Sequence, residues 1–216
     1  MLKPGKKTYI EELISRGEGE MLDFKHSIND SKKIARSVAA FANTKGGILL
    51  IGVKDNGSIV GVNSDEEFYM VEAAAQLYCK PEVPFEVKKW PVNGKMVLEV
   101  IIKPSLRGPH TAPDKNGTYL AFVRVADENF VASPIQYKVW KAEKQREAIT
   151  FTITGKEQHL MEILRNNGKV SAAEYAKAAF ISLDEAEEFL VKMVVLRLAK
   201  LESATDEAPY FLGYRL

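Results

Sequence analysis

The sequence predicts an α+β protein: a mixed β-sheet with packed helices over residues 1–149, followed by a smaller domain over residues 150–216. Two observations predict the first domain. Residues 31–43 carry apolar side chains at helical spacing, and residues 48–51 form a short uninterrupted apolar run, which is typical of a central strand. A third observation predicts the second domain, where three helical patterns precede two segments with strand character.

Two elements open the chain. Thr8 and Glu11 fit a capping box, which predicts a short first helix. Residues 21–25 are then expected to be extended, so that their side chains alternate between two faces. The apolar residues share one face and the charged residues share the other: Leu22 and Phe24 against Asp23 and Lys25.

The segment from residue 31 to residue 62 organises the first domain. Its apolar side chains fall on one stripe of a helix, which Asp30 or Ser31 can cap. The glycine pair Gly46-Gly47 allows the chain to reverse into the central strand, because glycine tolerates positive φ. Asp55-Asn56-Gly57 then predicts a tight hairpin turn into a second strand.

The elements that follow have their own start and stop signals. Ser64 and Glu67 fit another capping box, and the helix that they begin is expected to end near Lys80, before two prolines. Ser133-Pro134 is a favourable start for a later helix. The loop of residues 104–117 contains three prolines, and loops of this length are often functional or mobile. Strands are predicted over residues 85–90, 95–103 and 119–125.

Several dispersed motifs of this chain occur in the order in which a known family carries them. They are Glu18, Asp23-Phe24-Lys25, Ala40–Thr44, Gly46-Gly47, Ile51–Val53, Asp55, Gly57–Gly61, Tyr119-Leu120 and Val123–Val125. The set resembles the Schlafen AlbA-like domain, which is often described as DNA-binding, over roughly residues 10–140. One position departs from the family, which commonly has Glu where this chain has Asp23. The resemblance implies a mixed sheet with packed helices and a nucleic-acid partner.

Composition narrows the functional classes. The formal net charge is only +1, so contact with a polyanion must come from a local basic patch rather than from the overall field. Cys79 is the one cysteine, which excludes an internal disulfide and a multi-cysteine metal site. The N-terminus lacks the apolar core of a signal peptide and no apolar run has membrane-spanning length, so we expect a cytoplasmic protein without a membrane partner.

Three acidic residues form one candidate site. Schlafen members with ribonuclease activity use three carboxylates, and the resemblance implies Glu18 and Asp23 as two of them, with Asp55 as the nearest third. Converging carboxylates would bind Mg²⁺ or Mn²⁺ and activate water. The structural alternative is that Glu18 and Asp23 pair with nearby cations, while Asp55 is present because hairpin turns favour aspartate. We therefore expect that the protein has no cofactor and is not an enzyme. If these carboxylates converge, we expect instead a nuclease that uses Mg or Mn. The chain has no phosphate-binding loop motif, which excludes an ATPase.

Basic residues form the second candidate site. A helix that begins near Ser31 would present its N-terminal backbone N–H groups to an anion, and flanking cations would strengthen that attraction. Asn43 could hydrogen-bond a phosphate or a base, although ending a helix is the alternative role for it. The candidate nucleic-acid contacts are Lys25, His26, Lys32, Lys33, Arg36, Asn43, Lys45, Lys54 and Arg124.

The second domain resembles a winged helix-turn-helix in its layout, without a specific motif. Its predicted helices and ribbon strands cover residues 156–166, 172–179, 183–195, 194–201 and 210–216, with Ser171 and Ser182 as N-caps. The third helix opens with four acidic residues between Asp184 and Glu188, which would repel phosphates. This charge favours a module for assembly or partner binding over the primary DNA reader.

These observations predict a nucleic-acid-binding transcriptional regulator that contacts phosphates through the basic patch of its first domain. Two alternatives stay open: a metal-dependent ribonuclease of Schlafen type, and an interaction scaffold without nucleic-acid affinity. The residues leave DNA and RNA equally possible as partners. Possible exposed β edges in both domains suggest a homodimer.

Overall fold

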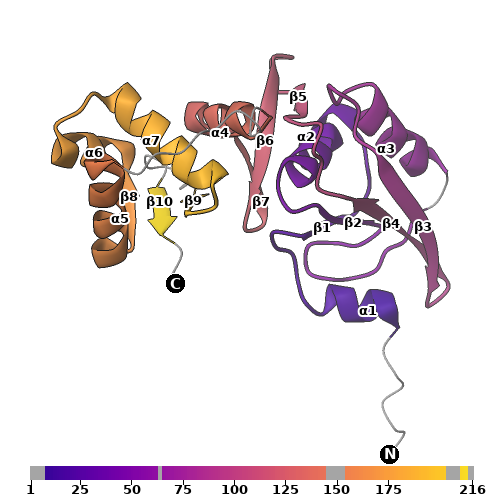
Figure 1. The fold of residues 1–216 in the computed structure, drawn as a ribbon. Coiled ribbons are helices and arrows are strands. Elements are labelled where there is room, and N and C mark those ends of the chain that lie inside the picture. Colours follow the sequence, from indigo (N-terminus) through magenta and orange to yellow (C-terminus); the bar gives the residue numbers. More distant parts are fainter. Residues whose placement is uncertain (1–7, 63–64, 145–153, 203–209, 214–216) are drawn as a thin grey trace, which may run out of the picture. The chain divides into compact units, whose positions relative to one another are not determined.

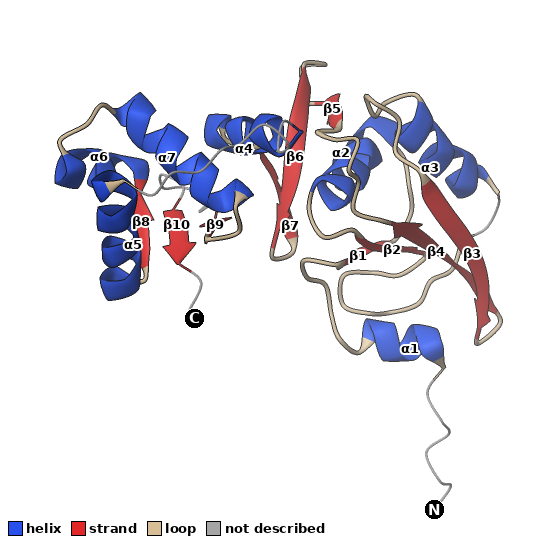
Figure 2. Cartoon of the chain, in the orientation of Figure 1, coloured by secondary structure: helices blue, strands red, loops and turns tan. Residues whose placement is uncertain are grey.

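The computed structural model describes residues 8–62, 65–144, 154–202 and 210–213, and confirms the α+β class (Figures 1 and 2). Its contacts divide the chain into two units, Met1–Val131 and Ala132–Leu216. We predicted the boundary between residues 149 and 150, a position outside the described residues. Helix α4 (Pro134–Lys144) belongs to the second unit because its buried Ile135 and Val139 pack in the core of that unit.

The first unit is built on a mixed four-stranded sheet with the order β1-β2-β4-β3. The strands are β1 (Leu22–Lys25), β2 (Gly47–Ile51), β3 (Phe85–Val92) and β4 (Lys95–Ile102). β1 and β2 are parallel, and the other two pairings are antiparallel. Helices α2 (Ser31–Asn43) and α3 (Glu66–Gln76) cover one face, whereas α1 (Tyr9–Ile14) covers part of the other (Figure 1). The predicted alternation in β1 is confirmed, since Leu22 and Phe24 lie in the core beneath α1.

Helix α2 follows from its sequence. Its predicted apolar stripe is buried, and of the two candidate caps it is Asp30 that accepts hydrogen bonds from the backbone N–H groups of Lys32 (2.8 Å) and Lys33 (3.3 Å). The reversal into β2 requires glycine at Gly47, where a Cβ atom would stand 2.4 Å from the Phe41 ring. This close approach brings the helix directly against the central strand.

A small antiparallel sheet completes the first unit. It has the order β5-β6-β7, with β5 (Thr111–Pro113), β6 (Tyr119–Val125) and β7 (Glu128–Val131), and it packs beside α2. The segment that we predicted as one loop therefore contains a strand, β5. Its neighbour His110 is fully buried, with Nδ1 2.8 Å from the Pro81 carbonyl and Nε2 2.7 Å from the Ser105 hydroxyl.

Two local predictions require correction. The turn at residues 55–57 forms, but the segment after it is not a strand: it makes only isolated bridges from Ile59 to Val53 and from Val62 to Met96. The predicted capping box of α3 used Ser64, which lies outside the described residues, and the helix follows Asp65 without a side-chain cap bond. The bridge to Met96, with a hydrogen bond from Val62 N to the Met96 carbonyl (2.8 Å), holds the segment after the turn beside the sheet.

A buried carboxylate joins α1 to the sheet. Glu99 of β4 is 0% exposed and accepts hydrogen bonds from the Tyr9 hydroxyl (2.7 Å) and from Trp90 Nε1 (2.8 Å). The pKa of Tyr9 is raised to about 12, mainly by the hydrogen bond from its hydroxyl to Glu99. Burial and the negative charge of Glu99 raise this pKa further. The polar network therefore fixes the position of the first helix, which is only six residues long.

The second unit contains α5 (Gly155–Asn167), β8 (Lys169–Ser171), α6 (Ala172–Ala179), α7 (Leu183–Val195), β9 (Ala199–Glu202) and β10 (Tyr210–Gly213), in addition to α4. The three predicted helices are present, and the predicted caps Ser171 and Ser182 accept hydrogen bonds from Glu174 N and Glu185 N. The predicted ribbon of β9 and β10 is joined by β8 in an antiparallel sheet of order β8-β10-β9. The turn of the ribbon lies outside the described residues. Across the described parts of both units, no helix is both long and apolar enough to cross a bilayer.

Candidate functional site

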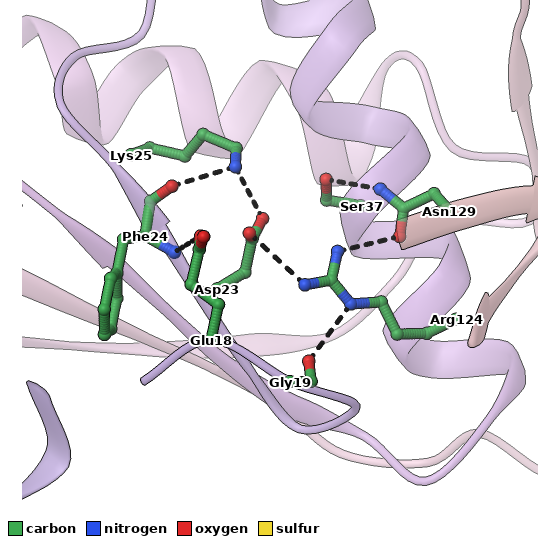
Figure 3. A network of polar contacts seen from close by, with 8 residues as sticks. All are labelled: Glu18, Gly19, Asp23, Phe24, Lys25, Ser37, Arg124 and Asn129. Carbon is green, nitrogen blue, oxygen red and sulfur yellow. Dashed lines mark hydrogen bonds and ion pairs between the residues drawn. The ribbon is translucent and has the colours of Figure 1, made fainter. Parts of the chain in front are cut away.

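The motif residues of β1 lead into a buried ionic cluster (Figure 3). Strand alternation directs Asp23 and Lys25 away from the core beneath α1, toward α2 and β6. Asp23 is 3% exposed, and its two carboxylate oxygens face two cations: Oδ2 lies 2.8 Å from Lys25 Nζ and Oδ1 lies 3.3 Å from Arg124 Nη2. Burying an unpaired carboxylate is costly, and the two cationic partners of Asp23 offset that cost.

Arg124 connects three elements from the interior. Its Nε donates to the carbonyl of Gly19 (3.3 Å), and its Nη1 donates to Asn129 Oδ1 (3.2 Å). Asn129 in turn donates to the hydroxyl of Ser37 on α2 (2.9 Å), and the guanidinium lies 5.2 Å from the centre of the Phe41 ring. The prediction that Arg124 contacts phosphate requires correction, because this residue is 3% exposed and its donors are directed at the protein.

Glu18 lies at the edge of this cluster. Its Oε1 accepts a hydrogen bond from the backbone N–H of Phe24 (2.8 Å). Burial raises the pKa of Glu18, and hydrogen bonding and repulsion with Asp23 raise it further, while the Phe24 N–H and the charge of Lys25 act in the opposite direction. Glu18 and Asp23 thus lie close together, and both carboxylates are engaged with donors or cations of the protein.

Asp55 does not complete the predicted acidic triad. It lies in the hairpin turn and lines an open pocket of about 370 Å³ together with His26, Lys54 and Asn56. Within the described ranges, no group of three His, Cys, Asp or Glu residues is placed to hold a metal ion together. Since both oxygens of Asp23 already face cations, these three residues do not fit a shared Mg²⁺ or Mn²⁺ site.

Most of the predicted basic patch is engaged within the protein. Lys25 is paired with Asp23, and Lys45 Nζ lies 2.6 Å from a carboxylate oxygen of Glu20. Arg36 Nε donates to the carbonyl of Pro113 (2.8 Å). The predicted cations therefore do not form one continuous accessible wall.

Asn43 has the structural role that was its alternative. Its Nδ2 donates to the carbonyls of His110 (2.8 Å) and Phe122 (2.9 Å), and its Oδ1 accepts from the backbone N–H of His110 (2.7 Å). These bonds fasten the end of α2 to the segment before β5 and to β6. Both N–H groups of the side chain and its oxygen are thus bonded to the protein backbone rather than directed at a ligand.

Lys32, Lys33 and Lys54 stay exposed, and no ion pair to them is found in the described residues. The start of α2 cannot present free N–H groups to an external phosphate in the way that we predicted, because Asp30 already caps it. Lys32 and Lys33, at the start of α2, remain available for contact with an anion. Lys32 lies 5.7 Å from the centre of the Tyr78 ring.

Sequence reasoning missed a second cation–aromatic pair. Lys80 lies 4.2 Å from the centre of the Tyr119 ring, and Tyr119 is 37% exposed. We name the residues Lys32, Tyr78, Lys80 and Tyr119 the cation–aromatic face. No local pattern predicts it, because its members come from α2, from the segment after α3 and from β6.

Backbone contacts bring these segments together. Cys79 Sγ lies 3.4 Å from the Ala35 carbonyl of α2, and Lys80 exchanges backbone hydrogen bonds of 2.9 and 2.8 Å with Thr111 of β5. β5 is paired with β6, where Pro113 lies opposite Tyr119. The two cation–aromatic pairs therefore lie on adjoining segments of one unit, and in each pair an ammonium group lies over a tyrosine ring.

Comparisons with known proteins bear on the first unit. The model of the family described as Schlafen, AlbA_2 matches residues 18–133. No curated protein matches the chain. The structure of the DIP2311 protein from Corynebacterium diphtheriae is 20% identical with a TM-score of 0.44, and the match covers 68% of this chain and 33% of that one. The N-terminal domain of a RecG-related protein from Nitrosomonas europaea is 20% identical with a TM-score of 0.41, covering 59% of this chain and 97% of that one. The matched region thus spans about a third of the Corynebacterium diphtheriae protein.

Proposed function

This chain belongs to the Schlafen AlbA_2 family, and on that basis we propose that it is a nucleic-acid-binding protein that acts in transcriptional regulation. The first unit binds the nucleic acid. The second unit, for which we propose a winged helix-turn-helix, serves assembly or partner binding.

The cation–aromatic face is the observation that supports binding most directly. An exposed tyrosine provides a surface on which a base can stack, and stacking tolerates any base because every base has a π face. The ammonium groups of Lys32 and Lys80, each over a tyrosine ring, attract the phosphates of a bound strand. Unpaired bases suit this arrangement best, because the bases of a duplex are already stacked on one another.

Electrostatics place limits on the strength of this binding. With a net charge of +1, the whole chain supplies no long-range field, so affinity must come from a few local contacts. Two carboxylates oppose an approaching phosphate: Asp30, two residues before Lys32, and Asp114, directly after β5, both of which accept hydrogen bonds from backbone amides. We therefore expect modest affinity that falls steeply with salt concentration.

The acidic start of α7 favours a protein partner for the second unit. Asp184 and Glu187 pair with Lys138 at 2.6 and 2.8 Å, and Glu185 pairs with Lys156 at 2.6 Å. These carboxylates would oppose a phosphate backbone at the helix end that enters the DNA groove in helix-turn-helix proteins. Beside them, Phe180 and Leu183 are 95% and 52% exposed, an arrangement that suits an apolar contact with protein.

Fluorescence anisotropy with labelled oligonucleotides tests the proposal. Single-stranded DNA, single-stranded RNA and duplex DNA of equal length are titrated with the full chain at several salt concentrations, with and without Mg²⁺. We expect binding that favours single strands. Tyr119→Ala should weaken it by roughly 5- to 150-fold, since stacking is worth about 1–3 kcal/mol per base.

Matched controls separate a specific face from general charge. Tyr69→Ala removes a more exposed tyrosine of α3, and Lys177→Ala removes an exposed lysine of the second unit, so both should leave affinity unchanged. Equal losses in Tyr119→Ala and Tyr69→Ala, or no binding at low salt, would contradict the proposal. Metal-dependent cleavage that disappears in Glu18→Gln would instead support the ribonuclease alternative.

A further inference from the structure

Strand β3 leaves one side of the main sheet open. In the described residues it pairs with β4 alone, and it is the outermost strand opposite β1 (Figure 1). It is eight residues long, which is enough for several hydrogen bonds to another strand. An edge of this length with unpaired N–H and C=O groups is a template for a further strand.

The hairpin turn between β3 and β4 determines which residues point outward. Asn93 and Gly94 have φ values of 51° and 75°, as a two-residue type I′ turn requires. Val92 and Lys95 are then the closing hydrogen-bonded pair, and alternate residues of β3 bond to β4. The residues whose backbone groups point away from β4 are Phe85, Val87, Lys89 and Pro91. Pro91 agrees with this assignment, because proline has no N–H to give to β4.

We propose that β3 pairs with β3 of a second copy of this chain, antiparallel, about a two-fold axis at Val87. A two-fold axis perpendicular to the sheet must pass beside a residue with outward backbone groups if that residue is to bond to its own copy. Val87 satisfies this condition at the centre of the open segment. The register pairs Val87 with Val87 and Phe85 with Lys89 of the second copy, and each of these pairs can exchange two hydrogen bonds.

The other two outward residues with an N–H give poorer registers. An axis at Lys89 would set Lys89 against itself and would place Pro91 opposite Val87, which removes a donor. An axis at Phe85 would reach beyond the start of the strand and leave few residues paired. Like charges that lie directly opposite each other destabilise a strand pair, so the register at Val87 is favoured.

Charge also favours the register at Val87. It places Glu86 opposite Lys88 of the second copy, twice in each dimer. Both side chains are exposed, and Lys88 has no ion pair in the part of the chain that the structure describes. Glu86 already lies 2.6 Å from Lys103, so the second copy's Lys88 would approach a carboxylate that is fixed in position. Edge lysines usually oppose strand addition, but here the glutamate matches the lysine in one register.

The resulting assembly closes on itself. Each copy contributes its single β3 edge, so pairing stops at two copies and joins the two four-stranded sheets into one. Dimerisation by this edge is independent of the cation–aromatic face, which is built from other elements. A failure of either proposal therefore leaves the other standing.

Cross-linking tests the register directly. In a hydrogen-bonded antiparallel pair the Cα atoms are about 5.5 Å apart, within the range that a disulfide spans. Val87→Cys should therefore form a covalent dimer under mild oxidation. Lys89→Cys is the matched control, because the two copies of that residue would be offset by four positions, or about 13 Å along the strands. The wild-type chain is the control for cross-linking through the native Cys79, which is buried. A Lys89→Cys dimer without a Val87→Cys dimer would overturn the register.

Sedimentation equilibrium on the full chain tests the dimer itself. Glu86→Lys or Lys88→Glu should weaken dimerisation by roughly 5- to 100-fold, because each reverses one charge in both symmetric pairs. The double variant Glu86→Lys/Lys88→Glu restores opposite charges and should recover most of the affinity. Glu82→Lys changes an exposed charge before the strand and should have no effect. The proposal would be overturned if the chain were monomeric at every concentration, or if neither charge reversal changed the dimerisation affinity.

Discussion

Asp23 and Arg124 form a buried ion pair, with 3.3 Å between Oδ1 and Nη2 and each residue 3% exposed. The pair joins the edge strand β1 to β6 of the small sheet. Two residues that the sequence suggested for contact with metal or phosphate are thereby directed toward each other. A family motif that suggests chemistry can thus serve to assemble the domain that carries it.

Replacing Arg124 should destabilise the first unit strongly. Arg124→Met removes one of the two cations that face the buried Asp23 carboxylate, and breaking a buried pair typically costs about 3–5 kcal/mol. We expect the lower end, about 3 kcal/mol, because Lys25 remains beside Asp23. Urea unfolding measures the loss. Asp23→Asn combined with Arg124→Met should recover part of it, and a single-variant loss below about 1 kcal/mol would contradict the structural role.

Asn43→Ala should weaken folding without changing nucleic-acid affinity. The substitution removes three hydrogen bonds to the backbone of His110 and Phe122 and leaves those groups without their partner, at a cost of about 2–3 kcal/mol. Thermal unfolding measures the first effect and anisotropy of the folded variant measures the second. A stable variant with weak binding would show that Asn43 contacts the ligand after all.

Glu18→Gln should stabilise the protein at neutral pH. The pKa of Glu18 is raised in the folded state, mainly by burial and then by Asp23, so its contribution to stability is present at low pH and is lost as pH rises through the folded pKa. Glutamine keeps an oxygen for the Phe24 N–H and avoids this loss. The Tm of the variant should exceed that of wild type at pH 7, and the difference should shrink as pH falls below the ordinary pKa of glutamate. An unchanged difference across this range would contradict the assignment.

Tyr9→Phe should reduce the free energy of unfolding below pH 10. The phenol donates to the buried Glu99 carboxylate, and its pKa is raised from 10.0 to about 12. The stability from this bond is therefore complete below pH 10 and is lost as pH rises toward 12. We expect a cost of about 1 kcal/mol at pH 8, at the low end for a bond to a charged group because Tyr9 is 42% exposed. Denaturant unfolding at pH 8 and pH 11.5 measures the difference, which should narrow at the higher pH.

Phe180→Gly should stabilise the second unit. Phe180 has a φ of 54°, in the left-handed region, and its side chain is 95% exposed. Glycine relieves the backbone strain but has more freedom to lose on folding, so the net gain is roughly 0.5–1 kcal/mol. Thermal unfolding gives the change, and Leu183→Ser provides a matched loss of exposed apolar surface without a change in φ. A loss of stability in Phe180→Gly would indicate that the ring packs within the unit.

Local signals in the sequence were sufficient for most elements. Capping residues such as Thr8, Ser171 and Ser182 lie where helices begin, and the stripe of α2 is buried as its spacing predicts. These signals act over one or two helical turns, so residues close together in the sequence are enough to reveal them. The alternation of Asp23 and Lys25 against Leu22 and Phe24 is local for the same reason.

Partners that are distant in sequence could not be predicted in this way. Whether Arg124 faces solvent or Asp23, and whether Asn43 meets a ligand or His110, depends on the packing of β6 beside α2. The sequence alone determined the α+β class, most of the helices and the charged face of β1, because backbone propensity and periodicity are short-range properties. The tertiary structure alone decided which charges are buried, which lysines stay accessible and that Asp55 stands apart from Glu18 and Asp23. Those outcomes depend on desolvation and on contacts between segments that only folding brings together.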